Sequence, residues 1–177
     1  MGEDEAAAHR QQDLYLSEVL RLMVACEYMR RYRGILARRV TWFGALRATA
    51  SSSAIAAWAV WQAYPMIWGG IIAGTQVADA LKDVFPFTAR HKAANDLVTS
   101  LEALLIETLY EAEGVYAGRL ANEEITERRR KLMKLRHDAD ARHFPAGDLP
   151  ERGDLLALAE RAASTYYASI FEPRANP

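Results

Sequence analysis

The stretch AIAAWAVWQAYPMIWGGIIAGTQVADAL, residues 54–81, decides the fold because it carries no charge until Asp79. The charge-free run extends back to residue 48 and is 31 residues long. One straight helix of that length would measure about 46 Å, whereas a bilayer core is about 30 Å thick. Pro65 lies near the middle and interrupts the helical pattern. The run therefore predicts a hairpin of two transmembrane helices, over about 43–63 and 66–85.

The side chains around this run predict its orientation. Arginines precede the first span, basic residues 90–92 follow the second, and the connection at 61–66 has no charge. Because basic segments stay on the cytoplasmic side, we expect both termini in the cytoplasm and the hairpin in a bacterial inner membrane. Aromatic side chains at two depths fit the two membrane–water interfaces. These interfacial residues are Trp58, Trp61, Tyr64 and Trp68 near the tip and Trp42 and Phe85 near the base.

Small residues on the second span predict where helices pack. Gly70, Gly74 and Ala78 are spaced four apart, so they share one helix face. Such a face allows close backbone approach in lipid and favours a homo-oligomer. The same spacing also occurs where two helices cross in a soluble core.

Four polar side chains lie inside the predicted spans, where each needs a partner: Arg47, Gln76, Asp79 and Asp83. Arg47 and Asp83 are both 18 residues from Pro65, so an antiparallel hairpin brings them to the same depth. Asp79 lies one turn deeper than Asp83. It either takes part in pairing within the hairpin or faces an oligomer interface or a water-lined pore, and the sequence leaves both interpretations open.

Amphipathic helices are expected on both sides of the hairpin. The predicted regions are an amphipathic N-terminal helix (1–40), the hairpin (41–87) and a cytoplasmic helical region (88–177). Within the last region one helix should end near Gly118, another should begin with Asn122 as its N-cap, and a third should follow Pro150. The third helix is expected to bury Leu155, Leu156, Ala159, Ala162, Tyr166 and Ile170. Nothing alternates with period two, so the predicted fold is all-α: a two-helix transmembrane hairpin flanked by long amphipathic cytoplasmic helices.

No motif indicates catalysis or a bound cofactor. HDADARH, residues 137–143, places its two histidines six apart, a poor spacing for metal ligation from a helix. The basic residues 128–131 lack interleaved aromatics and follow an acidic segment, so they indicate a solvated face rather than a nucleic-acid site. Phosphate-binding loops and nucleophile elbows are absent from the sequence. We therefore expect no enzyme activity, no cofactor, no metal and no nucleic-acid partner.

The order of these features resembles the SLATT superfamily, the two-transmembrane effector domains found beside bacterial nucleotide-second-messenger and other conflict systems. The resemblance covers roughly residues 18–142 and includes FPFTARHKAANDL at 85–97; residues 148–171 also resemble the tails of small SLATT-like proteins. It implies a membrane-embedded effector that oligomerises and permeabilises the membrane in antiphage defence. It carries over no catalytic residues. Because no sensor or nuclease domain is fused to these residues, a separate sensor or trigger protein encoded nearby is expected.

A soluble or peripheral helical-bundle adaptor without pore activity is the alternative. Ser51, Ser52, Ser53, Gln62 and Gln76 are polar residues that a bundle core tolerates better than lipid does. The sequence leaves open whether the hairpin lies in lipid or in the core of such a bundle.

Overall fold

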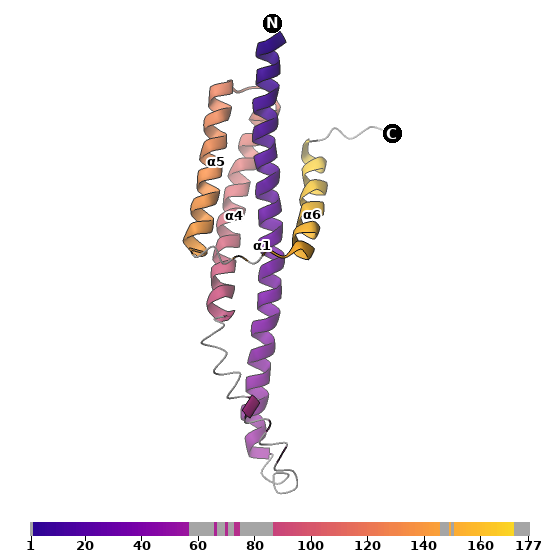
Figure 1. Cartoon of the computed structure of the whole chain (residues 1–177), viewed down its shortest axis with the longest axis vertical. Coiled ribbons are helices and arrows are strands. Elements are labelled where there is room, and N and C mark those ends of the chain that lie inside the picture. Colours follow the sequence, from indigo (N-terminus) through magenta and orange to yellow (C-terminus); the bar gives the residue numbers. More distant parts are fainter. Residues whose placement is uncertain are drawn as a thin grey trace, which may run out of the picture. The chain divides into compact units, whose positions relative to one another are not determined.

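The computed structural model describes residues 2–56, 66, 70, 73–74, 87–145, 149 and 151–171. Its long helices are α1 (Gly2–Ala56), α4 (Phe87–Tyr116), α5 (Asn122–His143) and α6 (Gly153–Phe171), drawn in Figure 1. No strand occurs among the described residues, so the expectation of an all-α fold is confirmed for this part of the chain.

Most of the predicted hairpin lies outside the described residues. Positions 57–65 and 75–86, which hold the tip and much of both spans, lie outside the described residues. Across the helices that the structure does describe, none is long and apolar enough to cross a membrane.

The chain divides into two compact units. Unit 1 contains residues 1–32 and 93–177, and unit 2 contains residues 33–92. Helices α1 and α4 therefore contribute residues to both units. The boundaries expected from the sequence, at 40 and 87, follow hydropathy, whereas these units follow packing, so the expected boundaries stay a prediction.

Unit 1 is a bundle in which contacts between distant residues define the helix directions. The contacts are Tyr15–Glu111 and Arg30–Glu102 between α1 and α4, Arg128–Glu111 and Ser100–His143 between α4 and α5, and Tyr116–Phe171 between α4 and α6. Between α1 and α4, and between α4 and α5, residues with higher numbers on one helix contact residues with lower numbers on the other. Helix α4 is therefore antiparallel to α1, and α5 is antiparallel to α4.

Apolar side chains from all four helices form the core of unit 1. The buried set is Tyr15, Val19, Leu22, Met23, Cys26, Met29 and Tyr32 of α1; Ala94, Leu97, Val98, Leu101, Leu105, Ala112 and Val115 of α4; Ile125 and Leu132 of α5; and Leu155, Ala159, Ala163 and Phe171 of α6. Fully burying one large apolar side chain contributes about 1.5–3 kcal/mol, so this layer is the main source of stability in unit 1.

The turn from α4 to α5 depends on Gly118. Its φ is +65°, in the left-handed region that favours glycine. The Gly118 amide donates to the Val115 carbonyl at 3.0 Å, and the Arg119 amide donates to the Gly114 carbonyl at 3.1 Å. These two bonds satisfy carbonyls at the end of α4 in a Schellman motif, as expected for a helix that ends beside Gly118.

The start of α5 differs from the sequence prediction. Asn122 is the first helical residue, and the N-cap position is Ala121, which has no side chain able to form a capping bond. The helix is stabilised instead by Glu123 and Glu124 in its first turn, near the positive end of the helix dipole.

The expected buried stripe of α6 is only partly correct. Leu155 and Ala159 are buried, but Leu156, Tyr166 and Ile170 are each at least 40% exposed. The remaining buried positions are Ala163 and Phe171, and Ala162 is only half-buried. Small alanines therefore form much of the contact face, and the larger side chains that give α6 its amphipathic pattern stay at the edge.

Candidate functional site

Two of the glycines expected to pack in the membrane have no close neighbour among the described residues. Gly70 and Gly74 are helical and exposed. A Cβ added at either would meet no heavy atom within 4 Å among the described residues. Any packing of these glycines against residues 57–65 or 75–86 lies outside the described residues. Ala78, the third small residue, lies outside the described residues.

The structure describes only some of the predicted intramembrane polar residues and interfacial aromatic residues. The backbone of Arg47 is part of helix α1. Trp42 on the same helix is 69% exposed, and its neighbour Phe43 is 43% exposed. The residues outside the description are Gln76, Asp79, Asp83, Trp58, Trp61, Tyr64, Trp68 and Phe85, together with the side chain of Arg47. Their assigned roles stay predictions.

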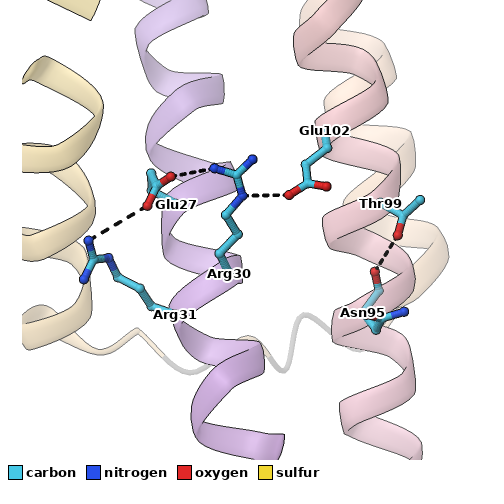
Figure 2. A network of polar contacts seen from close by, with 6 residues as sticks. All are labelled: Glu27, Arg30, Arg31, Asn95, Thr99 and Glu102. Carbon is cyan, nitrogen blue, oxygen red and sulfur yellow. Dashed lines mark hydrogen bonds and ion pairs between the residues drawn. The ribbon is translucent and has the colours of Figure 1, made fainter. Parts of the chain in front are cut away.

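An ion network joins α1 to α4 in unit 1, as Figure 2 shows. Arg30 Nε donates to Glu102 Oε1 at 2.6 Å, and Arg30 Nη1 donates to Glu27 Oε1 at 2.7 Å. Arg31 lies 3.9 Å from the second oxygen of Glu27. The hydrogen bond to Glu102 is the main cause that raises the pKa of Arg30. Because these side chains are partly exposed, the pair contributes only about 0–1 kcal/mol and mainly fixes helix register.

A second polar cluster surrounds the fully buried Tyr15. Its hydroxyl donates to Glu111 at 3.5 Å. Arg128 bonds to Glu124 at 2.7 Å and lies 3.4 Å from Glu111. Burial is the main cause that raises the pKa of Tyr15 well above its ordinary value, followed by the charge of Glu111. A phenol held neutral in this way is a structural tie between α1, α4 and α5 rather than an acid–base group.

A cleft of about 870 Å³ in unit 1 is lined by α1, α5, α6, Leu101 of α4 and the segment that precedes α6. At its edge the Arg152 amide donates to the Tyr28 hydroxyl at 3.2 Å, which ties the start of α6 to α1. Asp140 and Arg136 line the cleft from α5. Burial raises the pKa of Asp140, and the charges of Arg136 and His137 act in the opposite direction.

The cleft was missed by sequence reasoning. Asp140 was considered only within the HDADARH segment, as a metal ligand. Its spacing of four from Arg136 places both on one face of α5, which is the only sequence signal for this site. The opposite walls come from segments more than 100 residues away along the chain, such as Leu20 and Tyr28.

The geometry of the described residues provides no metal centre. Among them, no three His, Cys, Asp or Glu side chains converge to hold an ion. His143 instead lies 3.3 Å from the Ser100 hydroxyl of α4. Comparison of the chain with protein-family models, with curated proteins and with solved structures found no match.

Proposed function

We propose that the chain is a helical membrane effector. Residues 41–87 enter the bacterial inner membrane as a hairpin, several copies assemble, and the assembly permeabilises the membrane in antiphage defence. The observation that carries the proposal is the charge-free run 48–78 with basic residues at both ends. A run of this length and composition matches two passages through a bilayer core.

The described residues support different surroundings for unit 1 and for the region near residue 42. Unit 1 has its own buried core and interhelical ion pairs such as Arg30–Glu102, which suit an aqueous medium. Near the expected membrane boundary, the large apolar side chains of Trp42 and Phe43 are exposed instead. Exposed aromatics at this level fit an interface with lipid headgroups.

Assembly in the proposal uses the face that contains Gly70 and Gly74. No described heavy atom of the same chain lies within 4 Å of a Cβ added at either glycine, which is compatible with contact between copies. A hairpin of two helices cannot enclose a water path alone, so a pore requires several copies. Asp79 would then face water or a neighbouring copy, where its charge favours cations.

An adaptor without pore activity is the second candidate. It is favoured by the packed bundle of unit 1, whose surface carries large apolar side chains such as Ile106 and Tyr110, 71% and 82% exposed. An adaptor would use such a surface for partner binding and would need no membrane passage.

Carbonate extraction of membranes from a bacterial host separates the two candidates. The effector stays in the pellet, whereas a soluble or peripheral adaptor is released. Ion flux would then be recorded from liposomes containing the full chain, with and without the proteins encoded beside it. Cation-selective flux that loses selectivity in Asp79→Asn supports the effector. No flux with any neighbouring protein, despite a carbonate-resistant pellet, would contradict permeabilisation.

A further inference from the structure

We propose that the cleft between α1, α5 and α6 is a binding site for a lipophilic amine, a small molecule with an apolar body and a positively charged head. The cleft lies within unit 1, so this inference does not depend on the proposed membrane function. It rests on the size of the cleft, its apolar floor and the charges at its rim.

The cleft has the size and the floor of a small-molecule site. Its volume is about 870 Å³, within the ~300–1,000 Å³ that is usual for ligand pockets. Leu20, Val24 and Met29 of α1, Leu101 of α4 and Leu156 of α6 provide apolar side chains. The stretch of α1 from Leu20 to Met29 is about 13 Å long at ~1.5 Å per residue, enough for an extended alkyl chain.

Two of the three arginines that line the cleft already have carboxylate partners. Arg21 lies 3.0 Å from Glu18, and Arg152 lies 2.7 Å from Asp154. These two positive charges are therefore largely compensated and add little attraction for a ligand. The third arginine, Arg136, forms no ion pair within 4 Å with any described residue.

The remaining rim charges are mainly negative. Asp140 comes from α5, Glu151 from the segment before α6, and Glu160 from α6. Within the described part of the chain, none of these three carboxylates forms an ion pair shorter than 4 Å. Three carboxylates against Arg136 leave an excess of two negative charges around an apolar floor. This combination selects a cation with an apolar body and disfavours an acid of the same shape.

Asp140 gives independent support for a cationic occupant. Its carboxyl group is half-buried, and burial raises its pKa despite the opposing charges of Arg136 and His137. A half-buried carboxylate that forms no ion pair within 4 Å keeps part of the cost of losing water. An ammonium group in the cleft would offset that cost, so binding and ionisation of Asp140 favour each other.

The test uses dodecylamine with a photoreactive diazirine in its chain, and the matching dodecanoic acid and dodecanol. The full chain is labelled in lipid nanodiscs, or in buffer if carbonate releases it, and the adducts are mapped by mass spectrometry. We expect amine adducts on residues 20–29 and 156–164, and about tenfold less labelling there by the acid, equivalent to ~1.4 kcal/mol. Equal labelling by acid and amine, or no adducts on these segments, would overturn the proposal.

Ser164→Trp is a blocking variant, because Ser164 is an exposed residue of α6 that lines the cleft. Its control is Thr165→Trp, at the next exposed position, which does not line the cleft. The blocking variant should remove most amine adducts on both segments and the control should not. If Ser164→Trp lowers the melting temperature, the variant Glu160→Gln is tested instead, because Glu160 is exposed. It should reduce labelling by the amine and leave labelling by the alcohol unchanged; equal labelling by the amine before and after the change refutes the site.

Discussion

Gly114 and Gly118 of unit 1 differ from the glycines of unit 2 in what an added Cβ would meet. In unit 1, a Cβ added at Gly114 would contact Leu120 Cδ1 at 3.9 Å, and one added at Gly118 would meet Gln12 Nε2 at 3.7 Å. In unit 2, a Cβ at Gly34, Gly70 or Gly74 would meet no described heavy atom within 4 Å. Gly114 and Gly118 therefore contact their own chain, whereas a Cβ added at Gly153 of unit 1, like those at the unit 2 glycines, would meet no described heavy atom within 4 Å.

The aromatic side chains show this contrast only in part, because Tyr110 of unit 1 is 82% exposed. Tyr15 and Tyr32 are buried in unit 1, while Trp42 and Phe43 in unit 2 are exposed. The difference teaches that α1 carries exposed aromatic side chains beside the predicted first span and buried ones within the bundle. We expect lipid or a second copy to cover the apolar part of unit 2, and the predictions below test this contrast from the largest expected effect to the smallest.

Leu97→Ala should produce the largest loss of stability. Leu97 is fully buried in the core of unit 1, and removing such a side chain costs about 2–5 kcal/mol. Ile106→Ala on the same helix is the control, because Ile106 is 71% exposed and its loss should cost less than about 0.5 kcal/mol. Urea unfolding followed by circular dichroism measures both. Equal losses would mean that α4 does not pack as described.

Gly74→Leu should weaken self-association by about 1–3 kcal/mol, because it overpacks a contact between copies. Helix α1 and unit 1 should keep their fold, since a Cβ added at Gly74 meets no described heavy atom within 4 Å. Gly34→Leu is the matched control, a helical glycine that is equally open but outside the predicted spans. Crosslinking in detergent reports the oligomers. The same ladder for wild type and Gly74→Leu would remove this face from the interface.

The Arg30–Glu102 pair should show a smaller effect. Both side chains are more than one-third exposed, so their coupling should not exceed about 1 kcal/mol. A double-mutant cycle with Arg30→Met and Glu102→Gln, measured at low and at high salt, isolates this coupling. A coupling well above that value, insensitive to salt, would show that the pair is shielded from solvent.

Asp140→Asn should have the smallest effect, and the size of that effect depends on pH. The folded-state pKa of Asp140 is raised above the ordinary value of 3.8, chiefly by burial. The protonated carboxyl therefore contributes stability that is fully present below about pH 3.8 and is lost as pH rises through the folded pKa. Asp140→Asn should raise the melting temperature at pH 7, with a gain that disappears toward pH 3. A lower melting temperature at pH 7 would show that the charge stabilises the bundle.

The sequence was sufficient for the features that depend on local chemistry. Proline and glycine positions predicted the end of α4 beside Gly118 and the interruption before α6 near Pro145 and Pro150. Helical periodicity predicted helices over residues 1–40 and within 88–177, and the described helices α1, α4, α5 and α6 occupy these regions. These features depend on helix periodicity and on backbone preferences of single residues, so no tertiary information was needed.

The features that were missed depend on tertiary contacts. Arg30 and Glu102 are 72 residues apart, and no local pattern pairs them. The exposed Tyr166 and Ile170 have a core-like pattern, but α6 packs through Ala159 and Ala163, whose small size gives a weak hydropathy signal. The cleft combines residues from α1, α5 and α6, so only the pair Arg136 and Asp140 was visible in the sequence.

Labelling of Gln62→Cys in intact cells tests the central claim most directly. Cys26 suits this experiment as a silent background, because it is buried and burial raises its pKa to about 12, which leaves little thiolate to react. A Cys26→Ala background removes the remaining signal. We predict that an impermeant maleimide labels Gln62→Cys from outside, whereas Gln11→Cys is labelled only after the membrane is opened. Labelling of Gln11→Cys from outside with protection of Gln62→Cys, or labelling of both only after lysis, would contradict the hairpin.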